Sequence, residues 1–195
     1  MEITVIGELC NDVFVYGETK RLSPEAPVPV FNPLHTEINP GMAGNVVENL
    51  RALNKDIKIN FIHQKSPITK TRYVDDKSNH MFIRVDIENN IDELIMTEEV
   101  IKTISDSDAV IVSDYHKGFL SEEIVNDICF FSKFAVTDTK KLIGMLSLSC
   151  FDFVKLNEVE FNNHTINDKW LDKIIITLGS KGAKHMGVVY PSPDP

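Results

Sequence analysis

The 195-residue chain has few cysteines and no long apolar run, and each scarcity excludes a class of protein. Its three cysteines, Cys10, Cys129 and Cys150, are odd in number and show no Cys-x-x-Cys spacing, so we expect reduced thiols and no disulfide framework. The six histidines are scattered without metal-ligand spacing, which argues against a structural zinc site. No apolar stretch approaches the roughly 20 residues that a membrane-spanning helix needs.

Positive charge is also scarce. Acidic residues outnumber basic ones by 29 to 20, which gives a formal net charge of -9. Non-specific binding to nucleic acid needs a basic surface, so we expect no nucleic-acid partner. Residues 1–7 have a strand-like sequence without the basic region or cleavage site of a signal peptide. We therefore expect a cytoplasmic protein with no membrane partner.

Hydrophobic residues make up 43% of the chain and charged residues 25%, the proportions of an ordinary globular protein. In the first half, residues 2–6 predict a strand, and residues 13–17 and 27–31 predict two short strands of an exposed flap. Prolines in 27–31 would remove ladder hydrogen bonds, which favours a sheet edge for this strand. A helix over 42–53 and strands over 57–62, 69–74 and 80–87 follow.

From residue 97 onward, helical and strand patterns alternate. Ser121 is a plausible N-cap, because acidic residues follow it in the first turn of a predicted helix. Repeated βα units with apolar strands predict an α/β fold, in which helices cover both faces of a parallel sheet. The remaining predicted helices cover 97–104, 140–147 and 157–163, and the predicted strands cover 109–112, 134–137, 152–156 and 174–176.

Ligands of parallel α/β sheets bind where the strands end. Asp12 follows the first strand, and its carboxylate can accept hydrogen bonds from sugar hydroxyls; a turn-forming role is the alternative. Gly41 and Asn45 lie where the helix over 42–53 begins. Small residues there let backbone N–H groups approach a ligand, and the alternative is close helix–sheet packing.

Three later stretches also lie at predicted strand ends. Residues 113–118, SDYHKG, contain Lys117, which could meet a phosphate as a point charge or be merely exposed. Asn157 and Glu160 share a helix face and could orient a hydrated Mg²⁺. Residues 177–182, TLGSKG, offer hydroxyl and glycine N–H groups for an anion-binding nest.

The order of these motifs resembles that of the ribokinase-like (PfkB) carbohydrate kinases, and within them the D-glycero-β-D-manno-heptose 7-phosphate kinases. Residues 21–30, RLSPEAPVPV, look like the RxSPEAPVPV lid segment of the heptose kinases. Residues 41–46, GMAGNV, are similar to their GGAANV, with Met42 and Gly44 as departures. The stretches SDYHKG, DTK at 138–140, Asn157 with Glu160, and TLGSKG resemble the family's SDYxKG, DPK, NxxE and ATP-bordering segments.

This resemblance implies one truncated ribokinase-like domain over 1–195, with a small β-sheet lid formed by about 13–31 and 69–87. It implies an ATP- and Mg²⁺-dependent kinase for a sugar or phosphorylated sugar, and a homodimer formed through the lid strands. By the same resemblance, sugar hydroxyls would contact Asp12, Gly41 and Asn45, and phosphate groups would face Lys117 and Lys140. Mg²⁺ and phosphate would be organised by Asn157 and Glu160, with Glu160 acting on the metal indirectly, and the nucleotide would be lined by Thr177, Gly179 and Gly182.

The chain departs from the family pattern in two places. Only residues 54–68 stand where the family inserts a further strand, a helix and a GxDxxG loop. The family's GAGD motif, which supplies the anion hole and the aspartate base, lies beyond the position of Pro195, so we expect no catalytic base here and a kinase incomplete for catalysis. The alternative is a non-catalytic sugar-phosphate-binding or oligomerising module. A Rossmann-type dehydrogenase is disfavoured, because residues 7–12 lack GxGxxG.

Overall fold

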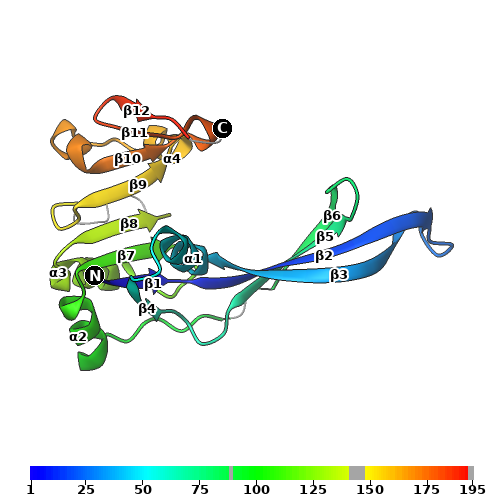
Figure 1. Ribbon diagram of the computed structural model, residues 1–195, viewed down its shortest axis with the longest axis horizontal. Coiled ribbons are helices and arrows are strands. Elements are labelled where there is room, and N and C mark those ends of the chain that lie inside the picture. Colours follow the sequence, from blue (N-terminus) through cyan, green and yellow to red (C-terminus); the bar gives the residue numbers. More distant parts are fainter. Residues whose placement is uncertain (88–89, 141–147, 193–195) are drawn as a thin grey trace.

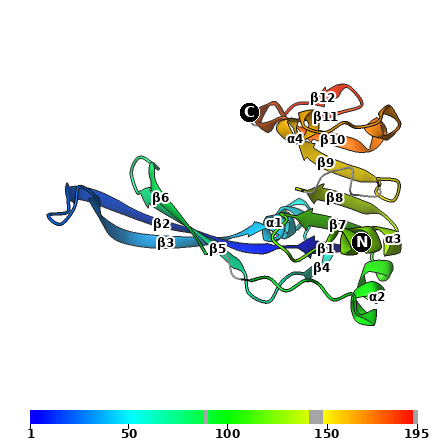
Figure 2. The same ribbon diagram turned by 180° about the vertical axis from the view of Figure 1, so that it is seen from behind.

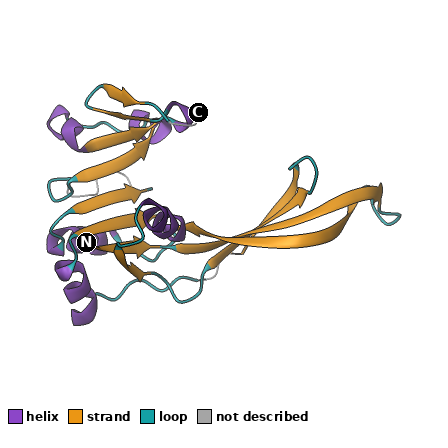
Figure 3. Cartoon of the chain, in the orientation of Figure 1, coloured by secondary structure: helices purple, strands orange, loops and turns teal. Residues whose placement is uncertain are grey.

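The computed structural model describes residues 1–87, 90–140 and 148–192, which form two β-sheets (Figures 1 and 3). Within these residues, the larger sheet has the strand order β12-β11-β10-β9-β8-β7-β1-β4, and the smaller has the order β3-β2-β5-β6. The larger sheet comprises β1 (Glu2–Gly7), β4 (Lys58–Ile62), β7 (Ala109–Asp114), β8 (Ala135–Thr139), β9 (Phe153–Asn157), β10 (Ile174–Thr177), β11 (Ala183–His185) and β12 (Val188–Tyr190). The smaller comprises β2 (Leu9–Leu22), β3 (Pro29–Met42), β5 (Ile68–Asp75) and β6 (Met81–Ile87).

The helices are α1 (Ala43–Leu53), α2 (Glu98–Asp106), α3 (Glu122–Phe131) and α4 (Glu158–Asn162), with short 3-10 helices η2 (Asp168–Lys173) and η3 (Gly179–Lys181). Neighbouring strands from β4 to β10 run parallel, while β11 and β12 are antiparallel. On one face of the sheet, Val47 of α1 packs with Ile3 and Val5. On the other face, Ile104 of α2 and Ile128 of α3 join the main core. The predicted α/β fold, with helices on both faces of a parallel sheet, is confirmed.

Side-chain caps explain where α2 and α3 begin. The Ser121 hydroxyl accepts a hydrogen bond from the Ile124 N–H at 3.3 Å, which confirms the predicted N-cap of α3. The Thr97 hydroxyl caps α2 in the same way, from the Val100 N–H at 3.3 Å. Each cap satisfies a backbone donor that has no partner within the helix.

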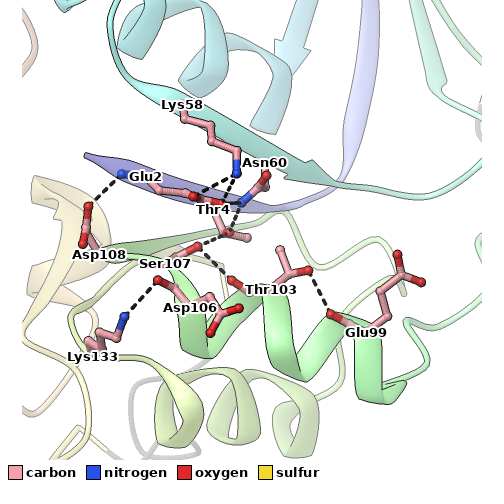
Figure 4. A network of polar contacts seen from close by, with 10 residues as sticks. All are labelled: Glu2, Thr4, Lys58, Asn60, Glu99, Thr103, Asp106, Ser107, Asp108 and Lys133. Atoms are coloured by element: carbon pink, nitrogen blue, oxygen red, sulfur yellow. Dashed lines mark hydrogen bonds and ion pairs between the residues drawn. The ribbon is translucent and has the colours of Figure 1, made fainter.

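A polar network closes the edge of the larger sheet where β1 begins (Figure 4). The Glu2 carboxylate accepts hydrogen bonds from Lys58 at 2.9 Å and Asn60 at 2.8 Å, and these bonds lower its pKa. The buried hydroxyls of Thr4 and Ser107 lie 2.7 Å apart. Ligands of parallel sheets bind at the opposite edge, so we assign this network to strand register and not to binding.

The smaller sheet projects away from the larger one as a long, twisted ribbon (Figures 1 and 2). Strands β2 and β3 each contain 14 residues and pair antiparallel, β5 joins β2 in parallel, and β6 joins β5 antiparallel. The predicted strands at 13–17 and 27–31 were right in type but too short. Polar residues and the prolines Pro33 and Pro40 hid the rest of the pattern. These prolines are tolerated because β3 is the edge strand, which confirms the predicted edge position.

The other predicted helices and strands match the structure to within a few residues, apart from the helix over 140–147. Of that helix only Lys140 lies within the described residues. Strands β11 and β12 and helix η2 were not predicted. Strands of three residues are too short for an alternating pattern to reveal them.

The expectation of reduced cysteines was wrong for two of the three. Cys129 and Cys150 form a disulfide, and their Cα atoms are 5.8 Å apart. Cys129 lies near the end of α3 and Cys150 lies just before β9, so the fold joins two residues that no spacing motif relates. Cys10 is a free, buried thiol in β2. Within the described ranges, no helix is long and apolar enough to cross a bilayer.

Candidate functional site

The residues predicted to bind ligands lie along one edge of the larger sheet, because the parallel strands end there. Strand register places Gly7 opposite Ser113, Asp114 opposite Thr139, and Asn157 opposite Thr177. The loops that follow β1, β7, β8, β9 and β10 therefore share this edge, which we call the strand-end edge. This is where parallel α/β sheets bind ligands.

Glu8 connects three of the segments at this edge, and it was not predicted. Its side chain is fully buried between β1 and β2. The carboxylate accepts hydrogen bonds from the backbone N–H groups of Tyr115, at 2.8 Å, and Lys117, at 3.0 Å. The Glu8 carbonyl accepts another from the N–H of Ala43, the first residue of α1, at 3.0 Å. Glu8 thus fixes both the 113–118 loop and the start of α1.

The 113–118 loop is ordered by side-chain contacts, so the interpretation as a merely solvated loop was wrong. The Asp114 carboxylate accepts hydrogen bonds from the His116 N–H at 2.9 Å and from the Thr139 hydroxyl at 2.8 Å. The Asp114 carbonyl accepts one from the Lys140 N–H at 3.0 Å. Lys117 is half-buried within this loop. The ends of β7 and β8 are therefore held together.

Gln64 fixes the point where the smaller sheet leaves the larger one. Its buried side-chain amide accepts a hydrogen bond from the Leu9 N–H at 2.8 Å and donates one to the Leu9 carbonyl at 2.7 Å. Leu9 begins β2, and Gln64 lies between β4 and β5. The two hydrogen bonds join the start of β2 to the segment that precedes β5, next to Glu8.

Asp12 lies within strand β2, so the turn-forming alternative was wrong. Its carboxylate accepts a hydrogen bond from Arg72 Nη1 at 2.6 Å, and the Arg72 guanidinium stacks over the Phe14 ring at 5.0 Å. A Cβ atom at Gly41 would lie 2.2 Å from Asp12 Oδ2, so glycine is required there. Arg72 and the backbone at Gly41 thus hold the carboxylate in one place, and Phe14 supports Arg72. Sequence reasoning missed Arg72, whose only signal is its position two residues after Lys70 in an alternating strand.

The start of α1 combines tight packing with an exposed amide. Met42 adopts φ 55°, a left-handed backbone conformation that favours glycine. Cβ atoms at Gly44 would lie 2.7 Å from the Leu9 side chain and 2.9 Å from Pro40, so close packing explains this glycine. Asn45, in contrast, is exposed in the first turn of α1. The packing alternative therefore applies to Gly44, while the Asn45 side chain remains accessible to a ligand.

Lys140 and Glu160 form an ion pair across the ends of β8 and β9. Glu160 also accepts a hydrogen bond from the Asn157 N–H at 2.8 Å, and the Asn157 side chain accepts one from the Glu160 N–H at 2.8 Å. Partial burial alone would raise the pKa of Glu160, but the Asn157 hydrogen bond and the Lys140 charge outweigh it and lower that pKa. Burial likewise acts to lower the pKa of Lys140, and the Glu160 contact outweighs it and raises the value.

Tyr115 lies between the two groups of predicted residues. Burial raises the pKa of its hydroxyl, and the negative charges of Asp138 and Asp12 raise it further, while Lys140 acts in the opposite direction. Asp138 itself forms an ion pair with Lys155 at 2.7 Å. The pKa of Tyr115 therefore depends both on the Asp12 carboxylate in β2 and on the charged groups of Asp138 and Lys140 at the end of β8.

Residues 177–182 form a compact turn instead of an open nest. The Thr177 hydroxyl donates a hydrogen bond to the Leu156 carbonyl at 3.3 Å. The N–H groups of Leu178 and Gly182 bond to carbonyls within the turn, at 2.8 and 3.0 Å. Gly179 and Gly182 adopt φ 62° and φ 93°, which explains why both are glycines. Several donors predicted to face an anion are therefore already used.

Among the described residues, no group of three or more His, Cys, Asp or Glu side chains could hold a metal ion. Two carboxylates at the strand-end edge, Asp138 and Glu160, each contact a lysine. Mg²⁺ often keeps several waters and uses one or two carboxylates together with phosphate oxygens. An indirect role of Glu160 toward Mg²⁺ bound to a nucleotide fits this arrangement.

The fold is that of the ribokinase-like carbohydrate kinases. A carbohydrate kinase from Agrobacterium tumefaciens matches with a TM-score of 0.59 at 13% identity, over 93% of this chain and 71% of that one. Arabidopsis thaliana ribokinase, solved with ribose and ATP, matches with a TM-score of 0.56 at 12% identity, over 95% and 75%. At these identities, the likeness establishes the fold and nothing more.

Comparison by sequence identifies a narrower group of relatives than comparison by structure does. The relatives described here are proteins named bifunctional protein HldE. The Helicobacter hepaticus protein is 32% identical over 164 residues, which cover 68% of this chain and 34% of the relative. The Nitrobacter hamburgensis protein is 29% identical over 158 residues, covering 65% and 32%. The chain thus spans about a third of the length of these relatives. No protein-family model matches it. The predicted resemblance to the ribokinase-like carbohydrate kinases is confirmed.

Replacing Glu8 tests whether it holds the site together. We expect Glu8→Gln to lower the free energy of unfolding by about 2–4 kcal/mol, because the amide cannot accept both backbone hydrogen bonds and its N–H₂ group would face a donor. Amide hydrogen exchange at Tyr115 and Lys117 should accelerate more than exchange in α3. The exposed Glu48→Gln variant is the control, and an equally small change in both variants would contradict this role.

The Lys140–Glu160 pair predicts a pH dependence of stability. The lowered pKa of Glu160 stabilises the fold above the unfolded value of about 4.3, and this contribution is lost as the pH falls through the folded value. Wild type should therefore exceed Glu160→Gln in urea-unfolding free energy at pH 7, with the gap closing below about pH 4. Because the Lys140 side chain is 41% exposed, we expect a gap of less than about 1 kcal/mol from the pair itself. Glu158→Gln, in the same turn, is the control for the loss of a carboxylate, and a gap between wild type and Glu160→Gln that stays constant with pH would refute the assignment.

Proposed function

We propose that this chain is part of an ATP-dependent kinase that acts on a phosphorylated sugar of the heptose 7-phosphate type. The observation that supports the proposal most is the setting of Asp12. Its carboxylate is held by Arg72 and by the space at Gly41, where the smaller sheet meets the strand-end edge. A carboxylate fixed in this way is a directed acceptor for the hydroxyl groups of a sugar.

On the sugar side, Asp12 accepts hydrogen bonds from substrate hydroxyls, and the exposed Asn45 amide adds a donor and an acceptor. Gly41 allows the substrate and the Asp12 carboxylate to lie close to the backbone. Lys117, in the loop that Glu8 orders, faces a phosphate group. The smaller sheet acts as a lid, formed by residues close to the expected 13–31 and 69–87, and closes over the sugar.

On the nucleotide side, Lys140 approaches the phosphates of ATP, and Asn157 and Glu160 organise the bound Mg²⁺ through water. When bound, Mg²⁺ neutralises phosphate charge and orients the terminal phosphoryl group. The turn at 177–182 borders the nucleotide through Thr177, Gly179 and Gly182. The Thr177 hydroxyl lies one strand away from Asn157, in register with it, so both line the same edge.

The proposal assigns binding and orientation, not proton transfer, to the residues of this chain. The 195 residues contain no Gly-Ala-Gly-Asp sequence, and we assign no catalytic base among them. A non-catalytic module that binds a phosphorylated sugar is supported by the same contacts. Measurements of binding therefore test the proposal more directly than measurements of turnover.

We further propose that the lid strands form a homodimer. One face of the smaller sheet is apolar and exposed: Ile38 of β3, Val85 of β6 and Ile83 of β6 have exposed fractions of 64%, 40% and 57%. Ile38 and Val85 lie in the same cross-strand row through Val13 and Thr71. A contiguous exposed apolar surface of this kind marks an interaction site, and a second copy of this chain is a partner that offers the same surface.

Asp12→Asn tests the sugar site. Isothermal titration calorimetry with D-glycero-β-D-manno-heptose 7-phosphate should show a dissociation constant about 10- to 100-fold higher than for wild type, because a charge-assisted acceptor is lost. Asp56→Asn, an exposed change in the turn before β4, should leave the constant unchanged. If Asp12→Asn binds as wild type does, while thermal melting shows both to be folded, Asp12 has no role in binding.

Ile83→Lys tests the dimer. Sedimentation velocity at micromolar concentration should give the mass of two chains for wild type and of one chain for the variant, because a buried unpaired lysine is costly at the interface. Leu53→Lys places the same charge at a residue of α1 that is 80% exposed and should remain dimeric. A monomeric wild type would exclude the lid interface.

A further inference from the structure

The two faces of the smaller sheet differ in chemistry. Alternate residues of a strand share a face, and register partners on adjacent strands lie side by side. Register aligns Asp12 of β2 with Lys70 of β5, and Lys70 with Asp86 of β6. The next row on the same face aligns Phe14, Arg72 and Arg84. We call this the charged face, opposite to the apolar face that carries Ile38, Ile83 and Val85.

The charged face is the one that meets the strand-end edge. Cys10 and Ile68 lie two residues before Asp12 and Lys70 on the same face, and with Met42 they form a buried cluster against Tyr115. The negative charge of Asp12 also raises the pKa of Tyr115. A ligand that reaches Asp12 from this edge therefore lies along the charged face.

The cations of this face are not equivalent. Arg72 pairs with Asp12 at 2.6 Å, and Arg84 pairs with Asp86 at 2.9 Å. Among the residues that the structure describes, no carboxylate forms an ion pair with the Lys70 ammonium. Lys70 is half-buried and lies in the row between Asp12 and Asp86. It is the cation next to Asp12 that is available to a ligand.

The charges of these two rows leave one cation over. Arg72 and Arg84 are direct register partners on adjacent strands, and like charges placed opposite each other destabilise a sheet. Asp12 and Asp86 each compensate one of the two arginines, so the positive charge left over in these rows is that of Lys70. Two further carboxylates of the described strands lie on this face: Glu37, exposed on edge strand β3 next to Phe14, and Glu18, farther along β2, which pairs with Lys20.

We propose that Lys70, assisted by Arg84, binds the phosphate group that the sugar substrate already carries, so that the charged face of the lid selects a phosphorylated sugar over a free one. The inference rests on the proposed function and adds its specificity-determining residues. It assigns the phosphate of the substrate to Lys70 and Arg84, in addition to Lys117, while Lys140 lies toward the nucleotide, beyond Tyr115.

The experiment compares two ligands that differ only in the phosphate. Calorimetry measures the binding of D-glycero-β-D-manno-heptose 7-phosphate and of the unphosphorylated heptose to wild type, Lys70→Gln and Arg84→Gln. We expect the phosphorylated sugar to bind at least about tenfold more weakly to Lys70→Gln, since a charge-assisted contact is lost, and the free sugar to bind within about twofold of wild type. Lys77→Gln, in the turn between β5 and β6, removes a charge from the same sheet and should change neither constant.

The outcomes separate the inference from the proposed function. If wild type binds neither sugar, the proposed function fails and the inference fails with it. If wild type binds the phosphorylated sugar and the variants weaken the binding of both sugars equally, Lys70 only supports Asp12, and the inference alone is overturned. Unchanged binding in both variants overturns it as well. Preference for the phosphorylated sugar should also fall with added salt in wild type, because ions screen partly exposed charges, and should fall less steeply with salt in Lys70→Gln.

Discussion

The candidate site depends on one buried carboxylate. Glu8 is fully enclosed, and a buried charge is tolerated only when hydrogen bonds replace the water that it has lost. The donors are two backbone N–H groups of the 113–118 loop, while the Glu8 carbonyl receives the first N–H of α1. The carboxylate can be satisfied only if the end of β1 and the loop after β7 adopt these positions together, and the backbone carbonyl of the same residue fixes the start of α1. The geometry of the edge is thus a condition of burying this side chain.

Glu8 also stands at the junction between the two sheets, because β2 begins at the next residue. Gln64 pairs with both backbone groups of Leu9, which leaves little freedom at this junction. Three residues further along β2, Asp12 is held by Arg72. The position of Asp12 relative to the 113–118 loop is therefore set by two short segments of backbone whose polar groups are satisfied. Movement of the lid would have to arise farther along its 14-residue strands, beyond this anchored base.

Local sequence patterns were sufficient for the parallel strands of the larger sheet, most of which are short apolar runs, and for the start of α3, which the cap residue Ser121 marks. They were insufficient where a residue is explained by a distant partner. Glu8 resembles a solvent-exposed turn residue until the loop 107 residues later in the chain supplies its donors. The role of Arg72 is explained by its hydrogen bond with Asp12, 60 residues away, and that of Cys129 by its disulfide with Cys150. No local periodicity of the sequence predicts either contact. The full length of β2 and β3 escaped prediction because both faces of these strands lie outside the main core, so no simple alternation of buried and exposed residues marks them.

The same lid strands carry two surfaces, and strand geometry makes this possible. Since successive side chains point to opposite faces, a single alternation in β5 places Lys70 and Arg72 on one side and Thr71 and Tyr73 on the other. Because a sheet without a packed face is marginal in water, the apolar face must be packed if the charged face is left open to a ligand. Burying the apolar face against a second copy of the chain would stabilise the sheet. On this view, pairing of the lids and recognition of a phosphorylated sugar are linked: the contact that stabilises the sheet leaves its charged face toward the ligand.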